Sequence, residues 1–139
     1  MSKYIHKVNY YETDKMGITH HSNYIRFMEE ARMDLLTKIG YPMTRLEAEG
    51  ITSPVVSVNC EYKKPTTYDD EIEIEVHISQ YTGVKLTLCY AMTNIKSGDT
   101  VATATSSHCF IDENKRPIAV KKFFPEFDAV LRNESVNHN

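Results

Sequence analysis

The sequence lacks an excess of positive charge. Its 139 residues carry 16 lysine and arginine side chains against 19 aspartates and glutamates, a net charge of −3 at neutral pH. No overall basic field therefore attracts the chain to nucleic acid or to an anionic membrane. Basic residues gather only locally, in residues 61–65 and 114–122. We expect neither a nucleic acid nor a membrane as the partner.

The sequence also lacks long apolar runs and a cysteine framework. No run approaches the roughly 20 apolar residues of a membrane span, and residues 1–12 have no signal-peptide core. The three cysteines, Cys60, Cys89 and Cys109, are far apart and each lies in a strand-like stretch. This pattern favours buried free thiols over disulfides or a zinc site. We expect a cytoplasmic protein.

Glycine is scarce, and its positions divide the chain cleanly. All five glycines fall where the residue pattern changes, as expected for turns and helix ends. There is no internal repeat, low-complexity tract or linker. A chain of this length buries most of its apolar surface in one unit, so we expect a single domain over residues 1–139.

One long helix is predicted over residues 23–39, where apolar residues recur at steps of three and four. Ser22 or Asn23 can cap its start, Gly40 suits the left-handed position after its end, and Pro42 prevents continuation. Shorter helices are predicted over residues 43–49 and 123–132.

The remaining stretches read as strands, over residues 3–12, 53–64, 70–79, 84–92 and 100–112. Residues 70–79 and 84–92 alternate strictly around Gly83, which is typical of an antiparallel hairpin with one buried face. The fold class is therefore α+β, a curved antiparallel sheet of about five strands around one long helix. Such a sheet leaves an open edge, which favours dimerisation.

Asp14 is the first candidate for catalysis. It precedes the long helix, in a loop that two rigid elements would hold. A carboxylate can serve as nucleophile or base, and the backbone N–H groups of His21, Ser22 and Asn23 would lie at the positive end of the helix. This combination suits acyl transfer. The alternative from the residues alone is an aspartate that supports a turn.

Residues 12–32, ETDKMGITHHSNYIRFMEEAR, resemble the signature of hot-dog-fold acyl-CoA thioesterases of the 4-hydroxybenzoyl-CoA thioesterase type, in their YbgC/FadM-like branch. The matching positions are Thr13-Asp14, Gly17, His21, Asn23-Tyr24, Phe27 and Glu29-Glu30-Ala31-Arg32. Residues 61–75, EYKKPTTYDDEIEIE, resemble a second block of the family through Tyr62, Pro65, Tyr68, Asp69 and Asp70. The resemblance covers nearly the whole chain.

This resemblance implies a hydrolase that converts acyl-CoA and water to a carboxylate and CoA, without a metal or bound organic cofactor. The implied catalytic residues are Asp14, His21 through its backbone N–H, and Gly17. The implied substrate-binding residues are Asn23, Tyr24, Tyr62, Lys63 and Lys64. Homodimers or homotetramers are implied, with active sites at the dimer interface. Whether acyl-carrier protein can replace CoA as the donor of the thioester stays open.

Several assignments stay open at this stage. The CoA phosphates need clustered basic groups, and the candidates are Lys63, Lys64, Arg116, Lys121 and Lys122. The acyl pocket is expected to include residues such as Tyr24, Met28, Tyr62 and Tyr68. Neither the acyl group nor the choice between nucleophile and general base for Asp14 follows from the sequence.

Three other interpretations of the catalytic residues and one non-catalytic alternative compete with this assignment. A metal site of Asp14 with His20 and His21 is disfavoured, because adjacent histidines point in different directions and no other ligand cluster lies nearby. Enoyl-CoA hydratases of this fold have a histidine five residues after the aspartate, where this chain has Thr19. Glu29 and Glu30 are interpreted as structural ion-pairing groups. A non-catalytic acyl-CoA or acyl-carrier-protein binder remains the alternative from another class.

Overall fold

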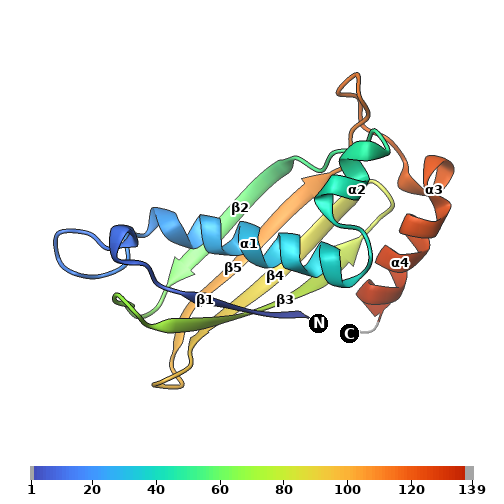
Figure 1. Ribbon diagram of the computed structural model, residues 1–139. Coiled ribbons are helices and arrows are strands. Elements are labelled where there is room, and N and C mark those ends of the chain that lie inside the picture. The colour runs from blue at the N-terminus through green and yellow to red at the C-terminus, as the bar shows by residue number, and fades with distance from the viewer. Residues whose placement is uncertain (1, 137–139) are drawn as a thin grey trace.

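One antiparallel sheet of five strands, in the order β1–β3–β4–β5–β2, forms the framework of the computed structural model, which describes residues 2–136 (Figure 1). Its strands are β1 (Ser2–Lys7), β2 (Val55–Tyr62), β3 (Glu71–Tyr81), β4 (Lys85–Asn94) and β5 (Thr100–Cys109). The helical elements are the 3₁₀ turn η1 (Tyr10–Glu12) and the helices α1 (Ser22–Lys38), α2 (Met43–Ala48), α3 (Val120–Phe123) and α4 (Pro125–Val136).

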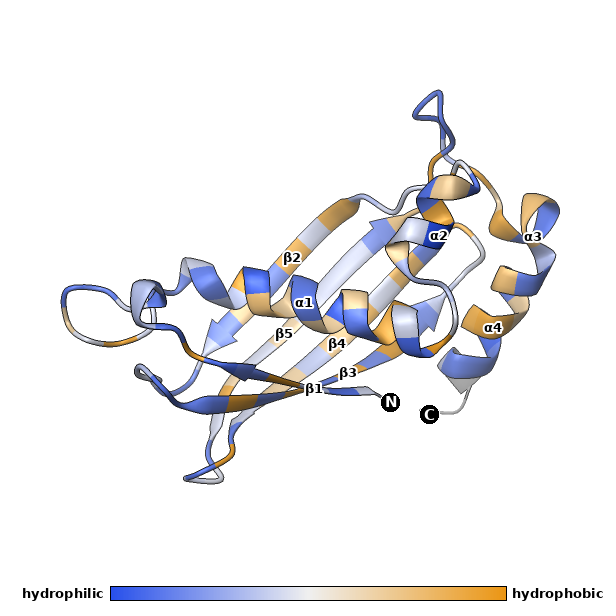
Figure 2. Ribbon diagram, in the orientation of Figure 1, coloured by the Kyte–Doolittle hydropathy of each residue, from blue (hydrophilic) through white to orange (hydrophobic). Residues whose placement is uncertain are grey.

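The hairpin of β3 and β4 is confirmed. Ile74 pairs with Met92 and Val76 with Tyr90, and all four side chains are buried on the face toward α1. Their sequence neighbours are more exposed, and Figure 2 shows the hydrophobic and hydrophilic bands that alternate along these strands. Alternation with a period of two therefore gives this sheet one face for the core.

The long helix is also confirmed, and it lies across one face of the sheet (Figure 1). Its buried residues, at helical spacing, include Tyr24, Phe27, Ala31 and Leu35. The helix ends as the sequence predicts: Gly40 has a φ of +91°, a conformation that glycine adopts without steric cost. Pro42 then precedes α2, so α1 cannot continue.

Some expectations about the elements are wrong. The first strand ends at Lys7 rather than residue 12, because Asn9 and Glu12 form a capping box that turns residues 10–12 into η1. The expectation of one long helix is incomplete, since α4 spans 12 residues and also packs on the sheet. Phe127 of α4 packs with Tyr41, their ring centres 4.6 Å apart, and this burial holds the helix in place.

Strand β2 lies at one edge of the sheet, where it pairs only with β5. Every residue of β2 is exposed or half-buried, and the exposed set includes Val55, Val56, Val58 and Tyr62. An edge that presents both unpaired backbone groups and exposed valine side chains is typical of a surface that pairs with another chain. Within residues 2–136, no helix is both long and apolar enough to cross a bilayer.

Candidate functional site

Asp14 lies in a short closed loop, residues 13–19, which we call the Asp14 loop. Thr13 and Thr19 form an antiparallel bridge at its base, and the Asp14 N–H donates to the Ile18 carbonyl at 2.8 Å. Gly17, at a φ of +79°, donates its N–H to the Asp14 carbonyl at 2.9 Å. The Oδ1 atom of Asp14 accepts the Met16 N–H at 2.8 Å. A β-carbon at position 17 would be strained, so glycine gives the loop its shape.

The Asp14 loop is fixed to the segment that follows β2. The Thr19 N–H donates to the Thr66 carbonyl at 2.8 Å, and the hydroxyls of Thr19 and Thr66 lie 2.6 Å apart. The Thr66 hydroxyl also lies 2.8 Å from the Tyr24 hydroxyl of α1. Thr66 is completely buried. One buried hydroxyl therefore connects the loop, the helix and the segment after β2.

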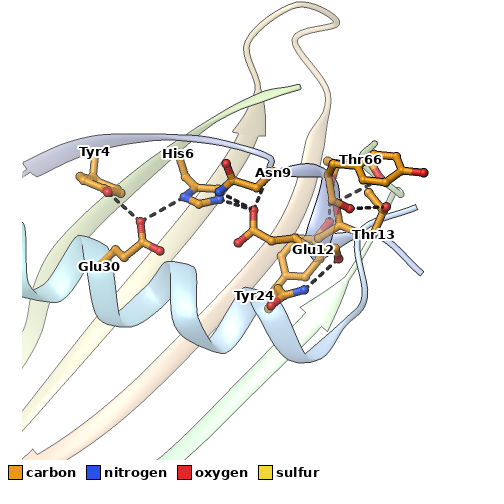
Figure 3. Close-up of polar contacts among 11 residues, drawn as sticks. Tyr4, His6, Asn9, Glu12, Thr13, Tyr24, Glu30 and Thr66 are labelled. Carbon is orange, nitrogen blue, oxygen red and sulfur yellow. Dashed lines mark hydrogen bonds and ion pairs between the residues drawn. The ribbon is translucent and has the colours of Figure 1, made fainter. Parts of the chain in front are cut away.

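A second network connects β1 to α1 beside the loop (Figure 3). Both ring nitrogens of the buried His6 contact carboxylates, Nε2 with Glu12 at 2.8 Å and Nδ1 with Glu30 at 3.0 Å. Glu30 also accepts the Tyr4 hydroxyl at 2.7 Å, a hydrogen bond that raises the pKa of Tyr4 to about 12. The His6 ring stacks on Phe27 at 4.0 Å. Buried polar groups with partners make this junction rigid.

Glu12 extends this network to the start of α1 through its backbone. Its carbonyl accepts the His20 N–H at 2.8 Å and the Asn23 side-chain amide at 2.8 Å. Asn23 is buried and lies outside the lining of the cleft described below. The sequence suggested Asn23 for substrate binding or capping, whereas its amide holds the helix start against η1.

The helix start differs from the predicted cap. Neither Ser22 nor Asn23 is the capping residue; the N-cap position is His21, without a side-chain cap. Instead, the His20 Nδ1 atom lies 3.2 Å from the Ser22 backbone nitrogen and accepts its N–H, and the His20 carbonyl accepts the Asn23 N–H at 3.0 Å. The His21 N–H has no acceptor among residues 2–136. It is the free donor at the positive end of the helix.

A cleft of about 520 Å³ joins most of the predicted site residues. Its lining consists of Asp14, Met16, Ile18, Thr19, His21, Tyr24, Tyr62, Lys63, Lys64 and Pro65. The Asp14 loop forms one side, the first turn of α1 another, and the end of β2 with the residues after it the third. The cleft brings six of the eight residues together and leaves out Gly17 and Asn23.

The wall from β2 is tied to the helix start. The Tyr62 hydroxyl donates to the His21 carbonyl at 3.1 Å, and the Tyr62 and Tyr24 rings meet edge to face at 5.3 Å. Lys63 and Lys64 form surface ion pairs, with Glu61 at 3.0 Å and with Asp99 at 3.2 Å. Exposed pairs of this kind are weak, so an anion can compete for both lysines.

Other candidates from the sequence lie elsewhere. The turn and helix that carry Arg116, Lys121 and Lys122 do not line the cleft, and α3 lies at the end of the sheet away from the Asp14 loop (Figure 1). Tyr68 is exposed and packs on Tyr10 at 5.7 Å. Met28 is buried and lines a separate cavity, described below.

The two adjacent histidines do not point apart as expected. Their rings stack at 4.3 Å, since the His20 side chain folds back over the helix start. In the described part of the chain, no group of three or more His, Cys, Asp or Glu residues has an arrangement that could hold a metal ion. Glu30 has the expected structural contacts, but Glu29 forms no ion pair with any residue that the structure describes. The three cysteines are free and half-buried rather than fully buried.

Sequence reasoning missed Thr66 and Glu12, which position the loop. The capping-box spacing of Asn9 and Glu12 was a usable signal for the turn. Thr66 gave no signal, because its partners Thr19 and Tyr24 lie more than 40 residues away in the sequence.

Comparisons with known proteins agree on one family. Residues 8–133 match the model of the thioesterase-like superfamily. YneP of Bacillus subtilis is 38% identical over 122 residues, 87% of this chain and 88% of YneP. The acyl-CoA thioester hydrolase YbgC of Escherichia coli O157:H7 is 30% identical over 66% of this chain and 68% of its own length. The DHNA-CoA thioesterase of Staphylococcus aureus superimposes with a TM-score of 0.91 at 29% identity, over 95% of this chain and 89% of that one. The chain belongs to the thioesterase-like superfamily.

Proposed function

We propose that the protein is an acyl-CoA thioesterase, which hydrolyses an acyl-CoA thioester to a free carboxylate and CoA. The observation that carries this proposal is the cleft itself, where the Asp14 carboxylate and the first turn of α1, with its free His21 N–H, line one space. The names of YbgC and of the S. aureus enzyme, both CoA thioester hydrolases, support the same substrate class.

The proposed reaction uses Asp14 and the helix start together. The thioester carbonyl oxygen accepts the His21 N–H, which stabilises the negative charge that develops on this oxygen. Removing one such donor typically raises a barrier by about 3 kcal/mol. Asp14 either attacks the carbonyl carbon or removes a proton from the attacking water. In the first route the carbon–sulfur bond breaks to leave an anhydride between Asp14 and the acyl group, and water then hydrolyses this anhydride and regenerates the Asp14 carboxylate. In the second route water adds to the carbonyl carbon directly, and the carbon–sulfur bond then breaks. In both routes the CoA thiolate leaves and takes up a proton.

The other residues of the cleft have supporting roles in this proposal. Gly17 shapes the loop that presents Asp14, and Asn23 acts as a positioning residue through the Glu12 carbonyl. Tyr24 and Tyr62 form the walls beside the acyl group. Lys63 and Lys64, the basic side chains of the lining, are assigned to the CoA phosphates. The reaction as written requires water and no metal or organic cofactor.

We assign the active form to a homodimer or homotetramer that pairs through β2. The open β2 edge and its exposed valines support this assignment. We assign one catalytic domain to residues 1–139, which fits the family match over residues 8–133. The cytoplasm is the location that we assign to it. Acyl-carrier protein is an alternative donor of the thioester. A non-catalytic binder of acyl-CoA is the competing function. Binding alone does not require a carboxylate beside a free backbone N–H, so this pair of groups favours catalysis.

The test is thiol release from a panel of acyl-CoA and acyl-carrier-protein thioesters, with the wild type and Asp14→Asn. The substitution is nearly isosteric, so we expect an intact fold and a loss of about 10²–10⁴-fold in kcat. Asp69→Asn is the matched control, because Asp69 is exposed and lies outside the cleft. Wild-type turnover by Asp14→Asn contradicts the assignment of Asp14. Binding without thiol release by the wild type supports the non-catalytic binder instead.

A further inference from the structure

A second cavity, of about 200 Å³, lies between α1 and the sheet, next to the candidate active site. Its walls are apolar and include Met28 of α1 and Val58 of β2. Its floor is polar, with Arg32 of α1 and with Tyr90, Ser106 and His108 of the sheet. An apolar cavity with a few convergent polar groups is typical of a specific ligand pocket.

The one carboxylate in the lining of this cavity is that of the exposed Glu29, and Arg32 is buried there without an ion pair. It is 7% exposed, and no carboxylate of residues 2–136 lies within 4.0 Å of its guanidinium. Its one hydrogen bond, from Nη1 to the Ser53 carbonyl, is long at 3.5 Å. A guanidinium has five donors in a planar fork, and a buried charge is costly unless it is paired. The cavity therefore offers donors that need an acceptor.

His108 adds a second group of the same kind. It is 1% exposed, and its Nε2 lies 2.7 Å from the Ser106 hydroxyl, which lies 2.6 Å from the Tyr90 hydroxyl. The other ring nitrogen, Nδ1, has no hydrogen-bond partner, although the Pro54 carbonyl is near enough to influence the ring. A buried polar atom without a partner is rare in folded proteins. The hydrogen bond to Ser106 fixes the ring, which lines the cavity.

The position of the cavity follows from α1 and β2. Tyr24 of α1 and Tyr62 of β2 line the candidate active site. Met28 and Val58 line the second cavity, and each lies four residues from the tyrosine of its own element. Cys60, half-buried, lies between Val58 and Tyr62. Arg32 is 11 residues beyond His21, about 16 Å along the helix axis, and its side chain leans back toward the helix start. An acyl group held at the His21 N–H extends in this direction.

We propose that the second cavity receives the far end of the acyl group, and that Arg32, with His108 beside it in the lining, selects an acyl group that ends in a carboxylate. This inference rests on the proposed thioesterase function and names its substrate class. A plain alkyl end leaves the donors unpaired, and sites built to bond a polar group discriminate strongly against analogues that lack it.

The experiment compares kcat/KM for matched pairs of thioesters. The pairs are alkanoyl-CoA against the ω-carboxyalkanoyl-CoA of equal length, from four to ten carbons. We expect the carboxylate-bearing member of at least one pair to be favoured ten-fold or more. Arg32→Met should reduce this preference at least ten-fold and change the plain substrate less than about three-fold. Arg26→Met, an exposed position on the same helix outside both cavities, should keep the preference.

A second variant covers the case that Arg32→Met does not fold. Val58→Phe fills the cavity from β2 and should lower kcat/KM for the favoured substrate while the shortest substrate is still hydrolysed. Equal rates for both members of every wild-type pair overturn the inference, and an Asp14-dependent activity in the same assay leaves the proposed function standing. A change in oligomeric state with unchanged preference in Arg32→Met also overturns it, because Arg32 then serves a subunit contact. No thiol release from any thioester overturns the function and the inference together.

Discussion

At the scale of single residues, His21 matters in two separate ways. Its ring lines the cleft, stacks on His20 and meets Tyr62 at 6.0 Å, while its backbone N–H is the free donor at the helix start. The family resemblance already implied a role for the backbone N–H, and the hydrogen bonds of the described residues leave this N–H without an acceptor. Two substitutions separate these groups, since alanine removes the ring and proline removes the N–H.

We predict that His21→Ala changes kcat only a few-fold and that His21→Pro lowers it about 10²–10³-fold. The φ of His21 is −56°, which lies within the range that proline adopts, so the helix start is retained. Thiol release in saturating acyl-CoA measures both rates, and circular dichroism checks the helix. A complete loss in His21→Ala would show instead that the imidazole takes part in the chemistry.

At the scale of elements, strand β5 carries a buried histidine, His108, which lines the cavity between the sheet and α1. Burial foremost, and then the Arg32 guanidinium, lower the pKa of His108 to about 4 from an ordinary value of 6.5. The unfolded chain therefore binds a proton between these pH values that the folded protein does not. His108 stabilises the fold fully above pH 6.5, and this contribution is lost as the pH falls toward 4.

We predict that this loss amounts to at most about 3 kcal/mol of unfolding free energy. Urea denaturation at pH 7.0, 5.5 and 4.5 measures it for the wild type and for His108→Gln. The variant should lose less stability than the wild type over the same interval, because it has no group at this position to protonate. Parallel curves for the two proteins would rule out His108 as the source.

The helices and strands also show which parts of the fold the sequence could predict. Strict alternation identified the hairpin of β3 and β4, and helical spacing with Gly40 and Pro42 identified α1, because both signals are local. The pairing of β2 with β5 rather than with β3 is a contact between distant segments, and no local pattern encodes it. The residues of the two cavities differ in the same way. Asp14 and His21 lie in one short stretch that the sequence identifies, whereas the burial of Arg32 is visible only in the structure.

At the scale of the whole molecule, the proposed dimer depends on β2. A charge on an edge strand opposes edge pairing, so we predict that Val56→Lys shifts the wild-type dimer or tetramer toward monomer. Ile5→Lys is the matched control, because Ile5 is equally apolar and exposed but lies on β1, at the opposite edge. Sedimentation velocity measures the distribution. A monomeric wild type, or an equal response of both variants, argues against assembly through β2.

The closure of the Asp14 loop by the Thr13–Thr19 bridge has a consequence for how such a protein diversifies. The carboxylate and the free amide both belong to nine consecutive residues, 13–21, and this stretch is anchored from outside through Glu12 and Thr66. The tyrosine wall and the lysines come from β2 and the residues after it, about 40 positions later. Reaction and recognition are thus encoded in separate stretches of sequence. Under the proposed function, substitutions of Lys63 or Lys64 change how CoA is recognised and leave the Thr13–Thr19 bridge, Asp14 and the His21 N–H in place.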